Sequence, residues 1–77
     1  MIMAKFIEID SKYRKMALNV DNIISYYAIK DNSIGFNSVI VFRDKILALN
    51  SAGMLVDTIM INVLDTYEEI KTAINNA

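Results

Sequence analysis

Apolar and polar residues alternate in the first strand-like segments of this 77-residue chain, and this period of two constrains its fold more than any other feature. Within residues 4–10, Ile7 and Ile9 fall on one side of the alternation and the acidic residues fall on the other. Residues 16–20 repeat the pattern. Because successive side chains of a β-strand point to opposite faces, this alternation indicates half-buried strands. The sequence therefore predicts a sheet built from short strands.

Short polar segments divide the alternating sequence into separate strands. The chain has no proline, so Asn, Asp and Ser must form the turns, as their side chains bond to nearby backbone. Residues 11–15 are expected to form a hairpin loop, and Asn19, Asp21 and Asn22 a turn or a single helical turn. Residues 31–33 are expected to form a tight turn. Strands are predicted at 4–10, 16–20, 23–30, 34–42, 46–49 and 54–63.

The middle of the chain admits two interpretations. Residues 50–53 suit a hairpin turn with Gly53 at the position that needs a positive φ, which would make the preceding residues a strand. Residues 44–52 also suit a short helix capped by Asp44, so both interpretations stay open here. Gly35 is expected to mark a bulge inside the fourth strand.

The C-terminal segment carries clear helical signals. Asp65 is a suitable N-cap with Glu68 three residues later, and Thr66 and Glu69 offer the same capping box one residue on. The apolar residues that follow share one helical face: Tyr67, Ile70, Ala73 and Ile74. Because a helix this short is marginal alone, its apolar stripe must pack on another element. The predicted fold is an α+β single domain over residues 1–77, a small meander-like antiparallel sheet of about five to six strands with one C-terminal α-helix on one face.

The two ends of the chain resemble a known family. The residues that carry the resemblance are Leu18, Asn19, Val20, Asp21, Ile23 and Ile24, followed near the C-terminus by Val63, Asp65, Tyr67, Glu68 and Glu69. In this pattern the chain resembles the small flagellar FlbD-like proteins and a broader group of uncharacterised bacterial and phage proteins of similar length. The resemblance implies a small antiparallel sheet plus a C-terminal helix, and it carries over no catalytic residues.

The residue types that usually perform catalysis or bind metals are scarce. The chain has no cysteine and no histidine, which removes disulfides, thiolate metal sites and the usual general base. Glu68 and Glu69 are adjacent in the expected helix and diverge by about 100°, so they do not form a catalytic pair. Two glycines do not suffice for a phosphate-binding loop. The sequence accordingly predicts no enzyme, no cofactor and no metal site.

Apolar residues make up 55% of the chain, above the ~45–50% typical of globular proteins. A domain this small has little interior, so apolar side chains are expected at its surface, where large patches mark interfaces. On a strand, Tyr26 and Tyr27 point to opposite faces, so one of them faces away from the core. The expected interaction residues are Tyr26, Tyr27, Phe36 and Phe42.

These observations favour a non-enzymatic protein-interaction module. The expected partner is a second copy of the chain, with a dimer favoured, or another protein. A phage-encoded inhibitor of a host protein is one role that fits this description. No segment approaches the ~20 apolar residues that span a membrane, and the N-terminal segment lacks the apolar core of a signal peptide. The cytoplasm is the expected location, with no membrane partner.

The polar loop after the first strand supports an alternative function. It contains Lys12, Tyr13, Arg14 and Lys15, with Lys5 close in sequence. Basic side chains contact phosphates and a tyrosine ring stacks on a base, so the loop would form a nucleic-acid-binding site. The net charge of −1 makes nucleic acid the less favoured partner.

Overall fold

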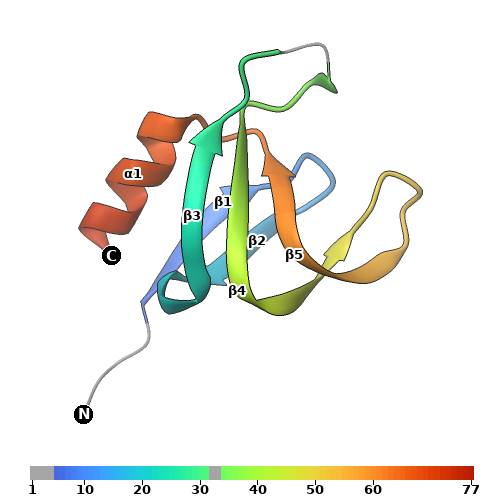
Figure 1. The fold of residues 1–77 in the computed structure, drawn as a ribbon, viewed down its shortest axis with the longest axis horizontal. Coiled ribbons are helices and arrows are strands. Elements are labelled where there is room, and N and C mark those ends of the chain that lie inside the picture. The colour runs from blue at the N-terminus through green and yellow to red at the C-terminus, as the bar shows by residue number, and fades with distance from the viewer. Residues whose placement is uncertain (1–4, 32–33) are drawn as a thin grey trace.

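Five antiparallel strands and a C-terminal helix make up the described part of the chain, which covers residues 5–31 and 34–77 of a computed structural model (Figure 1). The predicted α+β class is therefore confirmed. The elements are β1 (Phe6–Asp10), β2 (Lys15–Asn19), the 3₁₀ helix η1 (Val20–Asn22), β3 (Ile23–Ala28), β4 (Ser38–Leu49), β5 (Leu55–Val63) and α1 (Tyr67–Asn76). The turn predicted at 31–33 includes residues 32 and 33, and the first predicted strand includes residue 4; these three lie outside the described residues.

The strands belong to two sheets. β1 and β2 form a hairpin in which Ile7 stands opposite Leu18, while β3, β4 and β5 form a second sheet in that order. The expected helical turn between them is present as η1, which redirects the chain from one sheet to the other. In Figure 1 the β1–β2 hairpin lies behind the three-stranded sheet. Ile7 and Leu18 share one buried cluster with Ile40 and Ile61, so the core lies between the two sheets.

β4 is a single long strand, where two shorter strands were predicted. It runs through Ser38–Leu49, and its pairing with β5 shifts register between Val41 and Ile46. The alternative of a helix over residues 44–52 is wrong. The residues before β4 form a loop, so Gly35 marks no strand bulge; its φ of +79° belongs to that loop.

The turn between β4 and β5 agrees with its prediction. The Asn50 side-chain oxygen accepts from the backbone N–H groups of Ala52 and Met54 at 2.9 and 3.0 Å. Gly53 adopts a φ of +78° and donates its N–H to the Asn50 carbonyl. Glycine meets this conformation without the steric cost that a Cβ would add, which explains its position in the turn.

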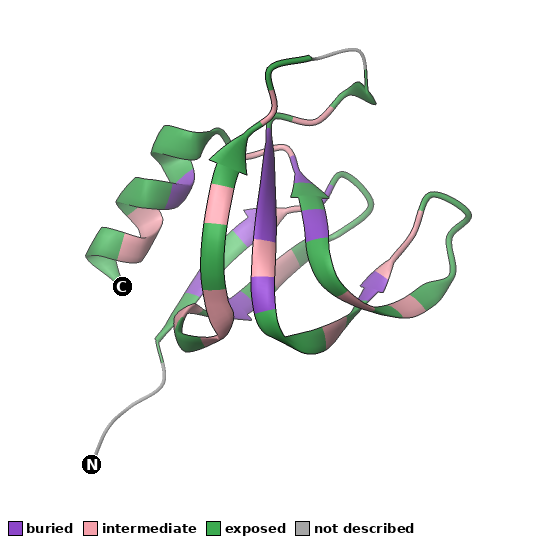
Figure 2. Cartoon of the chain, in the orientation of Figure 1, coloured by how far each residue is buried: buried purple, intermediate pink, exposed green. Residues whose placement is uncertain are grey.

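The helix α1 closes one side of the space between the sheets. Its capping box uses Thr66 and Glu69, the second of the two predicted registers. Ile70 is 1% exposed and belongs to the buried cluster, and the Tyr67 ring lies 5.1 Å from the Tyr26 ring, centroid to centroid. α1 packs on both β1 and β3. The inner face of the three-stranded sheet is therefore covered by the β1–β2 hairpin as well as by the predicted helix. Figure 2 shows the buried residues gathered where these elements meet.

Candidate interaction surface and pocket

The face of the three-stranded sheet that points away from the β1–β2 hairpin carries exposed apolar side chains. Tyr27 stands opposite Val39, and Val41 stands opposite Met60. These residues have the opposite parity to the buried Ile40, so they project outward. Tyr27 is 47% exposed, whereas Val39 in the central strand is buried by its neighbours. The polar side chains at the outward paired positions of this half are Ser25 and Asn62, so none of these positions is charged.

The far half of the β4–β5 hairpin extends this surface. Ala48 is buried in the core cluster, so the alternate residue Leu47 points outward and is 62% exposed. Leu55 alternates with Val56, which stands opposite Ala48, so Leu55 also points outward and is exposed. Ile59 lies between the two paired parts of β5, where the register shifts, and is 49% exposed. Asp57, opposite Leu47, adds one acidic side chain. We define the outer-face patch as Tyr27, Val39, Val41, Leu47, Leu55, Ile59 and Met60.

The predicted interaction residues divide between three environments. Tyr27 lies in the outer-face patch, as its alternation with Tyr26 allowed. Tyr26 points inward and its ring packs on the ring of Tyr67 in α1, so this side chain is already in contact with the helix. The expectation that Phe42 lies at an interaction surface has to be corrected. Phe42 shares inward parity with Ile40 and is only 2% exposed, so its ring is part of the core. Phe36 precedes β4 and lines a pocket.

Sequence reasoning missed most of the outer-face patch. The predicted strands 46–49 and 54–63 contain four of its residues, Leu47, Leu55, Ile59 and Met60. The predicted interaction residues were all aromatic, so these aliphatic residues were not among them. The signal that would have found them is parity. Once Ala48 is placed in the core, Leu47 must face outward.

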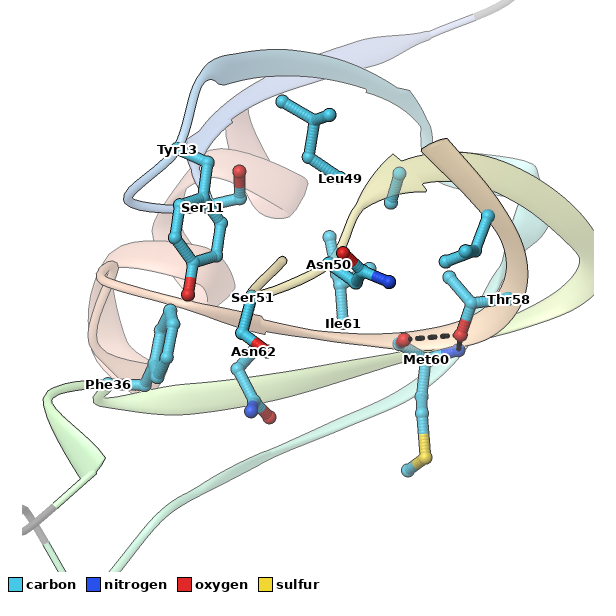
Figure 3. Close-up of a pocket in the computed structure, with 12 residues that line it drawn as sticks. Ser11, Tyr13, Phe36, Leu49, Asn50, Ser51, Thr58, Met60, Ile61 and Asn62 are labelled. Carbon is cyan, nitrogen blue, oxygen red and sulfur yellow. Dashed lines mark hydrogen bonds between the residues drawn. The ribbon is translucent and has the colours of Figure 1, made fainter. Parts of the chain in front are cut away.

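A pocket of about 260 Å³ lies between the β1–β2 turn and the far end of the β4–β5 hairpin (Figure 3). Tyr13 and Phe36 form its aromatic wall, and Ser11 and Asn50 are among its polar lining residues. Met60 also borders the pocket through β5, but Figure 3 shows its side chain pointing away. The Met60 side chain and the pocket therefore lie on different sides of β5. Among the described residues that line the pocket, none is acidic.

The basic loop contributes directly to the aromatic wall. The Tyr13 and Phe36 rings are tilted by 58° with centroids 6.4 Å apart, and Lys12 Nζ stands 5.5 Å from the Phe36 centroid. Lys12, Tyr13, Arg14 and Lys15 are all exposed on the β1–β2 turn. Lys5 lies at the opposite end of the hairpin, where its carbonyl accepts from Val20, so its closeness in sequence does not bring it to the loop.

Two polar side chains of the pocket are already engaged in the fold. The Ser11 hydroxyl donates to the Arg14 carbonyl at 2.8 Å and closes the β1–β2 turn. The Asn50 side-chain oxygen accepts the two turn bonds described above. Among residues 5–31 and 34–77, Asn50 Nδ2 makes no hydrogen bond, and Figure 3 shows it on the side of Thr58. It is thus a donor at the pocket that the turn does not use.

The acidic residues at the start of α1 are explained by folding. Asp65 Oδ1 accepts from the Asp10 N–H at 2.8 Å, and Glu69 accepts from the Thr66 N–H in the capping box. Within the described residues, no group of three or more acidic side chains is placed to hold a metal ion. None of the helices in that same part of the chain combines the length and apolarity needed to cross a membrane.

Comparisons with protein-family models, with curated proteins and with solved structures give no match to this chain. The resemblance to FlbD-like proteins therefore stays a prediction. The class that the geometry defines is a small α+β domain with two features of interest: an uncovered apolar sheet face and an aromatic pocket with a basic rim.

Proposed function

We propose that this chain is a non-enzymatic protein-interaction module that forms a dimer through its outer-face patch. The observation that carries the proposal is the set of exposed apolar side chains on β3, β4 and β5, which includes Tyr27, Leu47 and Met60. Burying apolar surface is favourable at roughly 25 cal/mol per Å², and large exposed apolar patches mark interfaces. A second copy of the patch would cover it.

The chemistry of the patch suits contact with itself. In a two-fold dimer the same surface meets its own copy, so a charged patch would repel itself. The outward paired positions around Val39 and Val41 hold no charge. The exposed Arg43 and Lys45 share the outward parity of β4, and Asp57 stands opposite Leu47, so the other half of the surface carries charges of both signs that can pair across a two-fold interface. Exposed Tyr27 would supply an aromatic anchor with a polar tip.

The size of the chain gives an independent reason for self-association. A domain of 77 residues buries a modest fraction of its surface, and domains of this size commonly gain stability from disulfides, metals or oligomerisation. Cysteine and histidine are absent from the sequence, which removes disulfides and the commonest structural metal ligands and leaves association or unusually good packing.

Light scattering across a dilution series of the purified protein tests this proposal. We expect the mass of a dimer at high concentration and a reversible fall toward the monomer mass on dilution. Amide hydrogen exchange at the two extremes should show the added protection concentrated in β4 and β5. A monomer mass at every concentration would contradict self-association, and protection concentrated in β1 and β2 would contradict the choice of face.

A further inference from the structure

The pocket beside the β1–β2 turn combines features that the outer-face patch does not explain. It presents an aromatic wall of Tyr13 and Phe36, an unused amide donor at Asn50, and the ammonium of Lys12 beside Phe36, which together with the exposed Arg14 and Lys15 of the same hairpin we call the basic rim. Its volume of about 260 Å³ is below the ~300–1,000 Å³ typical of sites for drug-sized ligands, so it suits one planar ring system. We propose that this pocket binds a nucleotide unit, with the base against Tyr13 and Phe36 and the phosphate on the basic rim.

The aromatic wall selects a planar group. Tyr13 is 45% exposed and Phe36 is half-buried, so each ring still has surface open to a ligand. Their tilt of 58° prevents them from stacking flat on each other. Bases stack on such rings with little dependence on sequence because every base has a π-face. Asn50 Nδ2 adds a hydrogen-bond donor that a base carbonyl or ring nitrogen accepts.

The charge distribution selects an anion. Lys12 reaches the aromatic wall, and Arg14 and Lys15 follow it as exposed residues of the same hairpin. None of the described lining residues carries a carboxylate; the carboxylate near Lys12 is that of Asp10, which accepts from the Lys12 N–H at 2.9 Å. The ammonium of Lys12 is held near the Phe36 ring, 5.5 Å from its centroid. A phosphate bound there would lie next to a base stacked on the same ring. The net charge of −1 supplies no long-range attraction, so the affinity must come from this local arrangement.

The backbone at Lys12 supports a role for its side chain. Lys12 adopts a φ of +76°, a conformation that favours Gly, Asn or Asp. Gly35 stands opposite: its φ is +79°, and a Cβ there would come within 3.3 Å of Lys12 Nζ. Lys12 thus occupies a position where glycine would be less strained, and Gly35 leaves room for its ammonium. The Lys12 N–H donates to Asp10 Oδ1 at 2.9 Å, which holds the backbone in this turn. Strained positions of this kind cluster at ligand-binding sites.

Titration followed by backbone amide NMR tests the proposal, with adenosine, adenosine monophosphate and a short oligothymidylate as probes at low salt. We expect shifts concentrated in residues 11–15, at Phe36 and at Asn50, and weaker binding of adenosine than of its monophosphate. Binding of the monophosphate would identify a free nucleotide as a sufficient ligand. If only the oligonucleotide binds, the pocket takes a nucleotide unit that belongs to a single-stranded nucleic acid. No shifts with any probe, or shifts confined to the outer-face patch, would overturn the proposal.

Two variants separate binding from folding. Lys12→Gly removes the charge and suits the positive φ, so the protein should stay folded while binding of the monophosphate weakens about fivefold toward the level of adenosine. Phe36→Leu should weaken all binding by about 5- to 150-fold, the range that one base–aromatic stacking contact accounts for. Lys71→Ala on α1 and Phe6→Leu on β1 are the matched controls, expected to leave binding unchanged. Unchanged affinity in Lys12→Gly and Phe36→Leu would overturn the site. Because the mass in solution is measured separately, failure here leaves the proposed dimer intact.

Discussion

The side-chain amide of Asn22 bonds both backbone groups of Asp44: Nδ2 donates to the carbonyl at 3.1 Å, and Oδ1 accepts from the N–H at 2.8 Å. Asp44 lies in the part of β4 where pairing with β5 shifts between Val41 and Ile46. Backbone groups in such a segment need partners outside the regular ladder. Asn22 supplies the donor and acceptor that a neighbouring strand would supply elsewhere, and Figure 1 shows that β4 bends strongly beyond this half of the sheet.

Replacing Asn22 should therefore weaken the fold. Asn22→Ala removes both hydrogen bonds, and at about 0.5–1.5 kcal/mol each the free energy of unfolding should fall by about 1–3 kcal/mol. Chemical denaturation measures the change. Asn75→Ala is the control, because Asn75 lies on the exposed side of α1 and alanine is the better helix former there. Equal stability of Asn22→Ala and the unmodified protein would show that water replaces the side chain at no cost.

Two buried serines should respond in opposite directions to alanine. Ser38 is fully buried and its hydroxyl has no hydrogen-bond partner in the described structure, whereas the buried Ser11 donates to the Arg14 carbonyl. A buried unpaired hydroxyl costs about 1–3 kcal/mol, so Ser38→Ala should raise the free energy of unfolding by about 1 kcal/mol. Ser11→Ala should lower it by a similar amount. Thermal unfolding of both variants checks the signs, and a loss of stability in Ser38→Ala would indicate that the hydroxyl has a partner after all.

Much of the local structure could be predicted because its causes are local. Period-two alternation identified β1 and β2, and β-branched and aromatic content identified β3 and β5. Gly53 identified the turn after β4, and the two candidate capping pairs located the start of α1. In each case the residues that determine the structure are close neighbours in the chain. The conformational demand, such as a positive φ at Gly53, is met by the residue itself.

The features that could not be predicted depend on contacts between distant residues. Alternation shows that Phe42 and Leu47 have opposite parity, but it does not show which parity meets the β1–β2 hairpin. In the shifted part of β4, the backbone of Asp44 bonds the side chain of Asn22, which is 22 residues away. The pocket likewise brings together Tyr13 and Asn50 from separate turns. Asn50 was recognised only as a turn residue, since nothing near it in sequence indicates a pocket.

The start of α1 gives a test that distinguishes the two capping residues. Thr66 accepts from the Glu69 N–H at 3.2 Å, while Asp65 bonds β1 through the Asp10 N–H instead. Thr66→Ala should lower the free energy of unfolding by about 1 kcal/mol, and Thr66→Ser should restore most of it. Circular dichroism of the helix during denaturation follows the effect. If serine and alanine behave alike at this position, the hydroxyl is not the cap that the geometry indicates.

The outer-face patch gives the sharpest test of function, because an exposed leucine can be charged without disturbing the core. Leu47 is 62% exposed, so Leu47→Lys should keep the monomer folded. In a two-fold dimer, the patches of both copies meet in one interface. Each introduced ammonium would then lose water or lie near the ammonium of the other copy, and both effects weaken the dimer. We expect the dimer dissociation constant to rise by at least about tenfold, measured by light scattering or sedimentation.

The matched control for this experiment is Phe6→Lys. Phe6 is 58% exposed and belongs to β1 in the other sheet, so the same change of chemistry is made at nearly the same exposure but outside the patch. Its dissociation constant should match that of the unmodified protein. If both variants weaken the dimer equally, a general effect of added charge is responsible. If Phe6→Lys alone weakens it, the interface lies on the β1–β2 hairpin and the outer-face patch is free.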